Sequence, residues 1–461
     1  MFRYIFYFIL ALFFVSCTSM QPNLNLEDKD FTKESFKNYE QNKNKRFEEL
    51  NSNAFLKDEK LKTIINLVLE NNKSLEIALL KIESSKALYG IQTSNLFPKI
   101  DANASLDRTK ASDTTNPNNR ILNNYKANVT ASFELDLFGK NQSLNEAAKN
   151  SFLATKYAYN STKLLLISET INSYLKLASS LENQKLSDEI LKNLEEVYTL
   201  TSKKYVLGAA SKQEMLASLA SLKEMENRSL EFENEVSKSI NALELLISSK
   251  LDENLIPSNF LKADYIDTLN YQIESNVLLN RPDIKEYEFK LREKNANIGA
   301  ARAAFFPSIS LTANTGYASN SLSGLFSNQN TFWQISPSIN IPIFTAGENI
   351  KRLEYSKKEQ EIALKEYERA IQTAFKEVND TLAIRKNIAS KLENYSLLLE
   401  SLKDTYNIVL NSYKIGKGSY LSLLIAQKEY INSKIAYTNL VLSELENRVD
   451  IFKTLGGEIK E

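Results

Sequence analysis

The sequence predicts an α+β membrane protein in which a helix–strand–strand–helix–helix unit occurs twice. Three observations predict this fold class: matched landmarks in the two halves of the chain, two very long runs without glycine or proline, and four segments in which apolar and polar residues alternate. We expect the two repeats to cover 56–260 and 261–461 and to intertwine in one protomer.

The N-terminus has the features of a secretory signal peptide over 1–16. Arg3 precedes an apolar stretch, Tyr4–Val15, that is too short to cross a hydrocarbon core of about 30 Å as a helix. The residues Phe14-Val15-Ser16-Cys17 are similar to a bacterial lipobox, so we expect a lipid on Cys17 and a lipidated segment over 17–55. An ordinary signal peptide with an incidental cysteine, or an uncleaved anchor, is the alternative.

The two halves match at landmarks that occur in the same order and at a nearly constant spacing. The matched pairs are Asn72 and Arg281, Gly90 and Gly299, Phe97 and Phe306, Leu137 and Ile343, and Tyr205 and Tyr413. Any one match could arise by chance. The shared order indicates a duplicated structural unit.

Each half contains one run without glycine or proline, Lys140–Val206 in the first and Glu348–Ile415 in the second. In the second run, apolar residues recur in alternating steps of three and four over Leu364–Tyr413, with Arg385 as the only charged member. A sustained 3.5-residue period predicts coiled-coil packing along the helix. A coiled coil alone would be the alternative fold, but it leaves the alternating segments unexplained.

Four segments alternate between apolar and polar residues, over 100–109, 125–137, 308–317 and 333–343. Strands of about ten residues suit a tilted crossing of a bilayer. Pro337 and Pro342 each remove a ladder donor, so the last strand should lie at an edge or contain a bulge. The alternative is a soluble pair of hairpins packed on a protein core, but no further strands are available to supply that core.

Four strands cannot close a membrane barrel, because such barrels begin at about eight strands. Two chains would give eight strands, a size whose interior fills with side chains. Three chains give twelve strands and the smallest arrangement here with an open lumen. Barrel closure therefore predicts a homotrimer.

Composition excludes several classes of function. Lys+Arg and Asp+Glu each total 57, so the chain lacks the basic excess expected of a nucleic-acid-binding protein. Histidine is absent and cysteine occurs once, which removes the usual ligands for a metal or haem cofactor. With neither a Ser-His or Cys-His pair nor a glycine-rich phosphate loop, we expect no enzymatic activity and no cofactor apart from the lipid.

Two stretches, Leu278–Ile284 and Asn297–Thr312, closely resemble the outer-membrane factors of tripartite efflux pumps. The resemblance is to the TolC superfamily, within its OprM/CmeC/NodT-like outer-membrane lipoprotein branch, and it extends from about Leu56 to the C-terminus. It implies a trimeric 12-stranded outer-membrane β-barrel continuous with a long periplasmic α-helical barrel.

The resemblance also implies a function, an exit duct that passively conducts drugs and other toxic small molecules out of the cell. Its implied partners are a periplasmic adaptor protein and an inner-membrane transporter of the resistance-nodulation-division (RND) type. Two alternatives remain open. One is an exit duct for type I protein secretion, and the other is a structural periplasmic coiled-coil lipoprotein.

The resemblance implies a periplasmic gate just after the second long helix. Relatives constrict the closed duct there with a ring of leucine and a ring of aspartate, and the matching positions are Leu421 and Ile425. Isoleucine in place of aspartate predicts a gate that is purely hydrophobic and closes by excluding water.

The turns between the long helices and their partners are the positions at which relatives contact the adaptor. The residues at the two turns are Tyr205, Leu207, Gly208, Ser211, Tyr413, Ile415, Gly416, Gly418 and Ser419. Alternatively, the glycines at these turns serve only as left-handed helix caps.

Charged residues on the polar strand faces are mostly acidic. Those expected to face the barrel lumen are Asp101, Asp107, Lys126, Glu134 and Asp136. An excess of negative charge around a pore predicts a mild preference for cations.

Overall fold

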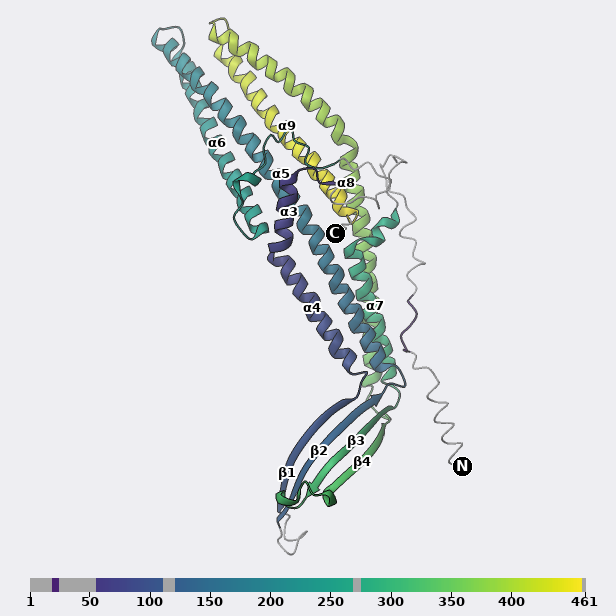
Figure 1. Cartoon of the computed structure of the whole chain (residues 1–461). Coiled ribbons are helices and arrows are strands. Elements are labelled where there is room, and N and C mark those ends of the chain that lie inside the picture. The colour runs from purple at the N-terminus through teal and green to yellow at the C-terminus, as the bar shows by residue number, and fades with distance from the viewer. Residues whose placement is uncertain (1–18, 25–54, 111–120, 268–274, 458–461) are drawn as a thin grey trace. The chain divides into compact units, whose positions relative to one another are not determined.

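The computed structural model describes residues 19–24, 55–110, 121–267 and 275–457 (Figure 1). The predicted signal peptide and Cys17 lie outside these residues. The first repeat contains α3 (Glu59–Asn71), α4 (Lys73–Ser94), β1 (Lys99–Lys110), β2 (Ile121–Leu135), α5 (Lys140–Val206) and α6 (Lys212–Ile247). The second contains α7 (Pro282–Ala303), β3 (Ser308–Ser319), β4 (Thr331–Asn340), α8 (Glu348–Lys414) and α9 (Tyr420–Thr454). Short 3-10 helices are η2 (Glu253–Leu255), η3 (Ser275–Asn280), η4 (Leu322–Gly324) and η5 (Asn328–Asn330).

The predicted duplication is confirmed, because the order helix–strand–strand–helix–helix occurs in both repeats. Two corresponding pairs of helices also have equal lengths: α4 and α7 each contain 22 residues, and α5 and α8 each contain 67. Both long helices begin directly after a glycine with positive φ, Gly139 (67°) or Gly347 (83°). Neither helix contains an internal glycine or proline that would interrupt its hydrogen bonds.

The predicted seam of α8 is buried at some of its positions and open at others. Ile371, Val378 and Ile388 are buried, as the coiled-coil period requires. Tyr395 is 38% exposed, and the second apolar stripe includes Leu397, which is 59% exposed. This part of α8 therefore presents apolar surface that one protomer does not cover.

The four strands form one antiparallel sheet in the order β1-β2-β3-β4 (Figure 1). The strands follow the predicted alternation over most of their lengths, but their ends differ from the prediction. β2 ends at Leu135 and β4 ends at Asn340. Pro342, which has no N–H to donate to a neighbouring strand, therefore lies outside the sheet. Pro337 lies on β4, an edge strand of the sheet, where proline is tolerated, and it pairs with Leu311 of β3.

The chain divides into two compact units, and each repeat contributes to both. The first unit contains the sheet, the described stretch 19–24 and the helical segments within 81–156 and 286–368. The second contains α3, the helical hairpins α5–α6 and α8–α9, and the start of α7. Its core includes Leu186, Leu222 and Ile431, and a separate cluster lies near the turns of the hairpins.

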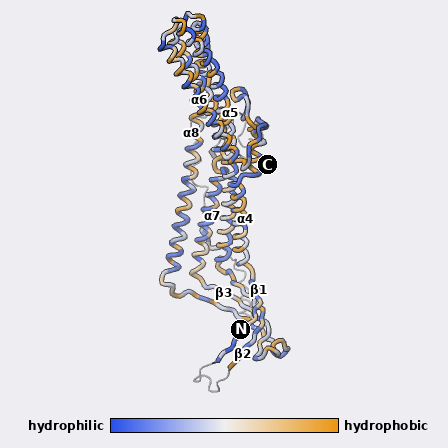
Figure 2. Tube along the Cα trace, turned by 90° about the vertical axis from the view of Figure 1, so that its left-hand side faces the viewer, coloured by the Kyte–Doolittle hydropathy of each residue, from blue (hydrophilic) through white to orange (hydrophobic). Residues whose placement is uncertain are grey.

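Hydrophobic and hydrophilic residues are interspersed along the helices (Figure 2). Within the part of the chain that the structure describes, no helix has an 18-residue stretch apolar enough to cross a membrane.

Candidate functional site

One face of the sheet is mostly polar, with Phe332 of β4 and Leu122 of β2 as apolar members near one end. The register places Asp101 opposite Thr130 and Ser105 opposite Lys126, so these side chains share a face because paired residues point the same way. In the middle of this face, the Asn128 amide donates to the Thr130 hydroxyl at 2.9 Å, and Thr130 is hydrogen-bonded to Asn314. These side-chain hydrogen bonds connect the polar residues of β2 and β3 on this face of the sheet.

The predicted charges on this face have different surroundings. Asp101, Asp107 and Lys126 form no ion pair within the described residues, and Lys126 lies over the Phe332 ring at 5.1 Å. Glu134 is paired with Lys140 at 3.1 Å. Lys140 is the first residue of α5 and not part of a strand. The alternation that identified the lumen charges therefore could not identify it.

Asp136 follows β2 instead of lying within it. Its Oδ2 accepts a hydrogen bond from the Gln142 N–H at 2.7 Å, at the first turn of α5. A carboxylate in this position is favoured by the unpaired N–H groups and the dipole of the helix. Asp136 therefore has a role in the start of α5 that its place in the alternating pattern does not reveal.

The opposite face of the sheet is apolar and exposed in one protomer. Trp333 is 77% exposed, and Ile100, Ile335 and Ile339 are exposed to a similar degree. Large exposed apolar surfaces mark contacts with a membrane or a partner. Polar on one face and apolar on the other, the sheet has the pattern of a wall between water and lipid.

The first hairpin turns at Gly208, whose φ of 74° is left-handed. The Ala209 N–H donates to the carbonyl oxygen of Lys204 at 2.7 Å, and Ser211 caps α6 in a capping box with Glu214. Leu207, which directly precedes Gly208, is 81% exposed. The turn therefore projects an apolar side chain into solvent on a well-capped backbone.

The second hairpin turns in the same way at Gly416, with φ of 79°. Gly418 packs closely against the end of α8, because a Cβ at this position would lie 3.0 Å from the backbone nitrogen of Tyr413. Ile415 is 68% exposed, and Ser419 caps α9 by accepting from the Ser422 N–H at 3.1 Å. Both predicted turns thus combine a left-handed glycine, an exposed apolar residue and a serine cap.

Tyr413 and Tyr205 occupy matching positions but have different environments. Tyr205 is 37% exposed, whereas Tyr413 is 4% exposed. The hydroxyls of Tyr413 and Thr201 are hydrogen-bonded at 2.6 Å, and Lys204 Nζ donates to the Tyr413 carbonyl oxygen at 2.8 Å. Burial raises the pKa of Tyr413, although the hydrogen bond to Thr201 opposes the shift. Tyr413 therefore connects the two hairpins and presents little surface to a partner.

The predicted gate residues lie in the first two turns of α9. Leu421 is 64% exposed and Ile425 is 55% exposed, whereas Tyr420 and Leu423 are buried in the hairpin core. Residues four apart share a face of a helix, so Leu421 and Ile425 form one apolar surface that points away from the protomer's own core.

Arg281 has a structural role that the sequence analysis did not assign. Its guanidinium donates to both carboxylate oxygens of Asp283, at 3.0 and 2.8 Å, and to Glu377 at 2.9 Å. A fourth hydrogen bond of 2.9 Å reaches the carbonyl oxygen of Thr454 near the end of α9. We call Arg281, Asp283, Glu377 and Thr454 the Arg281 cluster. It joins the start of α7 to α8 and α9 through a side chain that is only 9% exposed.

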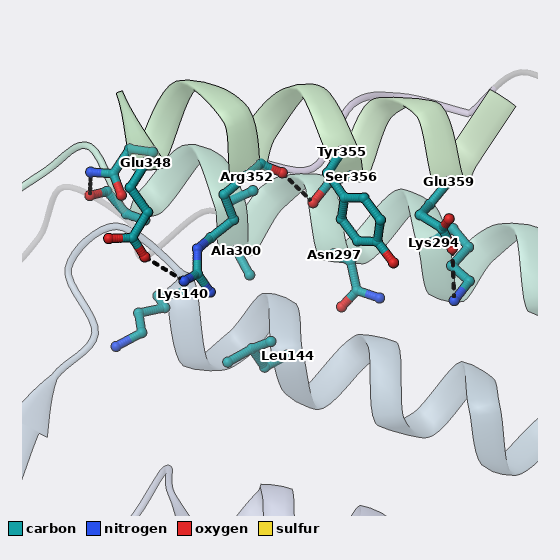
Figure 3. A pocket seen from close by; sticks show the side chains of 13 residues that line it. Lys140, Leu144, Lys294, Asn297, Ala300, Glu348, Arg352, Tyr355, Ser356 and Glu359 are labelled. Atoms are coloured by element: carbon teal, nitrogen blue, oxygen red, sulfur yellow. Dashed lines mark hydrogen bonds and ion pairs between the residues drawn. The ribbon is translucent and has the colours of Figure 1, made fainter. Parts of the chain in front are cut away.

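A cavity of about 450 Å³ lies between α5, α7 and α8 within the first unit (Figure 3). Small apolar side chains of α7 form much of its floor, and Arg352, Tyr355 and Glu359 point from α8 toward α7 and α5. Arg352 is paired with Glu348 at 2.6 Å. Over the residues the structure describes, no group of three or more acidic, histidine or cysteine side chains could hold a metal ion.

Comparison with known proteins identifies relatives over both repeats. The sequence model of the outer membrane efflux protein family matches residues 64–249 and 274–457. The solvent efflux pump outer membrane protein SrpC of Pseudomonas putida is 35% identical over 405 residues, which cover 87% of this chain and 86% of SrpC. The probable outer membrane lipoprotein SilC of Salmonella typhimurium is 31% identical over 406 residues, covering 87% of each chain.

Solved structures of similar fold cover nearly the whole chain. The open state of the MtrE outer membrane channel of Neisseria gonorrhoeae has a TM-score of 0.86 and 31% identity, and the match covers 95% of this chain and 98% of MtrE. The CmeC outer membrane channel of Campylobacter jejuni has a TM-score of 0.83 and 29% identity, with 95% of each chain covered.

Proposed function

The chain belongs to the outer membrane efflux protein family, and on that premise we propose a specific role for its sheet, hairpin turns and gate residues. It is a TolC-like outer-membrane channel, a trimer with a β-barrel and a helical barrel, and a component of a tripartite efflux pump. We propose that the polar face of the sheet lines the pore and that the apolar face contacts lipid.

One observation carries this proposal, the register of the four-stranded sheet. The pairing gathers most of the polar residues on one face and leaves β1 and β4 as edges without a partner strand in the described part of the chain. Three copies can pair these edges and close a twelve-stranded ring around a water-filled lumen. Light scattering of the detergent-extracted protein, corrected for bound detergent, should give three times 52.4 kDa less the signal peptides. A monomer that is soluble without detergent would contradict closure.

The transported substrates are proposed to be small organic molecules, because relatives are named for the efflux of solvents, toluene and antibiotics. The channel catalyses no reaction in this proposal, and the energy comes from the pump. A periplasmic adaptor and an RND transporter are the proposed partners. We propose that the exposed turns, in particular Leu207 and Ile415, contact the adaptor.

Efflux by the intact system tests this function and the turns together. Deleting the gene in its own bacterium should increase sensitivity to toluene and antibiotics, and the wild-type gene should restore tolerance. Leu207→Asp with Ile415→Asp should fail to restore it, because a charge in each exposed apolar turn disfavours an apolar contact. Lys212→Glu, beside the first turn, serves as a surface control. Unchanged tolerance on deletion, together with lost export of a protein, would favour the protein-secretion alternative.

Ion selectivity tests the proposed lining of the pore. Asp101 and Asp107 have no cationic partner among the described residues, so the open trimer should prefer cations mildly under a salt gradient. Asp101→Asn with Asp107→Asn should lower the cation-to-anion permeability ratio by roughly twofold. Glu253→Gln, which lies in η2 outside the sheet, should leave it unchanged. A reversal potential that favours anions in the wild type would contradict the prediction.

The lipid on Cys17 remains a proposal, and intact-mass spectrometry of the mature protein tests it. The mass should exceed that of the polypeptide by the acyl groups, and the excess should be lost in Cys17→Ala. Acyl chains contribute about 0.8 kcal/mol per buried CH₂ to membrane anchoring, so the variant should assemble less efficiently. Its single-channel conductance should match the wild type, because acyl chains enter lipid and leave the charges and apolar side chains of the proposed pore unchanged. A mature wild-type mass without acyl groups would refute lipidation.

A further inference from the structure

The described stretch 19–24, which we call the N-terminal strap, is held by α7 within the first unit. The Arg302 guanidinium donates a hydrogen bond of 3.0 Å to the carbonyl oxygen of Met20. The Asn295 amide donates one of 2.8 Å to the carbonyl oxygen of Pro22. Both acceptors are main-chain atoms, so α7 holds the strap through its backbone.

Gly299 allows the strap to approach α7 closely. It lies between the two donors on the same face of the helix, at the spacing of successive turns. A Cβ at Gly299 would lie 2.8 Å from the backbone nitrogen of Gln21 and 2.6 Å from Ser143 Oγ. Gly90 is the matching residue of the first repeat, and a Cβ there would meet nothing within 4 Å in the described part of the chain. The repeat therefore contains an uncrowded counterpart of Gly299.

The strap has a definite direction relative to the sheet. Arg302, which binds Met20, lies at the end of α7 that leads into β3. Asn295, which binds Pro22, lies about two helical turns farther from β3. Residues that precede Met20 are therefore on the side of the sheet.

A contact with α5 indicates the same direction. The hydroxyls of Ser19 and Ser143 are hydrogen-bonded at 2.9 Å, and Ser143 is in the first turn of α5, shortly after β2. A chain spans at most about 3.6 Å per residue, so the Cα of Cys17 is within about 7 Å of the Cα of Ser19. Docking of the strap therefore keeps Cys17 near the end of the helices that joins the sheet.

We propose that Asn295, Gly299 and Arg302 form a docking site for the strap that places the lipid anchor beside the sheet. The inference rests on the lipidation of Cys17 and the lipid-facing sheet proposed above. Acyl chains held there would enter the bilayer next to the apolar face of the sheet and promote its insertion and assembly. Because α7 continues the inner strand β3, the site does not use the edge strands that join neighbouring protomers in the proposed ring.

A disulfide between Ser19→Cys and Ser143→Cys measures docking, because these two side chains are in contact when the strap is docked. Cys17 is the only native cysteine, and lipidation consumes its thiol. The introduced pair therefore supplies the free thiols of the mature protein, which maleimide labelling after denaturation counts. Mild oxidation in intact cells should remove both thiols from this double-cysteine parent.

Two changes in the docking site should slow closure of the disulfide. Gly299→Ala should slow it by roughly threefold or more, because the added Cβ overlaps the strap. Arg302→Met, which adds no bulk at Gly299 and removes the hydrogen bond to Met20, should slow it as well. Gly90→Ala is the matched control and should leave the rate unchanged.

Two insertions test whether docking places the anchor. A Gly-Ser-Gly-Ser-Gly-Ser segment between Thr18 and Ser19 lengthens the tether from the anchor to the docked strap. The fraction of protein recovered as trimer from the outer membrane should then fall toward that of Cys17→Ala. The same segment after Leu24 leaves this tether unchanged, so trimer recovery should match the wild type. The disulfide should still close in both insertion variants.

The possible failures are distinguishable. Equal rates of closure in the double-cysteine parent, Gly299→Ala and Arg302→Met would overturn the docking site. Equal trimer recovery after the two insertions would overturn the placement of the anchor. Either result in a protein whose mass includes the acyl groups overturns this inference alone. A wild-type mass without acyl groups overturns the lipidation on which it rests.

Discussion

Replacing Leu421 or Ile425 by serine should raise the conductance of the closed channel severalfold, and replacing both should raise it further. Both side chains are exposed on one face of α9 and carry no charge, so three copies would form an apolar constriction. Such a constriction closes by excluding water, and a hydroxyl group makes it wettable. Single-channel recording in planar bilayers measures the effect directly.

A matched control for the gate comes from the first repeat, in which Gln213 and Ala217 occupy the corresponding positions. That hairpin carries no equivalent apolar pair, so Leu216→Ser, at a residue 49% exposed on α6, should leave conductance unchanged. Conductance identical to the wild type in both Leu421→Ser and Ile425→Ser would show that these residues do not close the pore.

Replacing Arg281 by methionine should destabilise the protomer more than any substitution on the helix surfaces. The change removes four hydrogen bonds and leaves Asp283 and Glu377 without their partner. Breaking a buried ion pair costs about 3–5 kcal/mol, but both carboxylates are more than one-third exposed, so we expect about 2–3 kcal/mol. The thermal unfolding midpoint of the trimer and its half-life under protease should both fall.

Arg352→Met provides the comparison, because Arg352 forms a pair with Glu348 one turn away on α8 in which the two side chains are 61% and 64% exposed. Surface pairs of this kind contribute about 0–1 kcal/mol, so its midpoint should stay close to the wild type. Equal losses in the two variants would show that the Arg281 cluster contributes no more than a surface pair. Conductance of folded Arg281→Met trimers should be unchanged, since none of the four residues of the cluster belongs to the proposed pore lining or gate.

The sequence predicted the faces of the sheet well and the ends of its strands poorly. A period of two determines which residues share a face, so Asp101, Asp107 and Lys126 could be grouped from the alternation alone. The alternation continues through Asp136, but the hydrogen bond to the start of α5 decides its position. The hydrophobic pattern does not show whether Asp136 continues the strand or caps the start of α5.

The candidate sites were predictable where local chemistry decides and unpredictable where distant contacts decide. Gly208 and Gly416 each require a left-handed backbone, which is visible in the sequence of the turn. The burial of Tyr413 depends on Thr201 and Lys204 of the other hairpin, so its match to Tyr205 in the repeat was not informative. Arg281 likewise depends on partners far along the chain.

The two unpaired edges of the protomer sheet have a genetic consequence. In a closed ring, each copy supplies one edge to each neighbour, so one defective β4 interrupts the whole ring. If a defective and a normal allele are expressed equally and assemble at random, only about one-eighth of trimers contain three normal copies. Alleles that damage β1 or β4 but still permit assembly should therefore be dominant, whereas alleles that prevent assembly should be recessive.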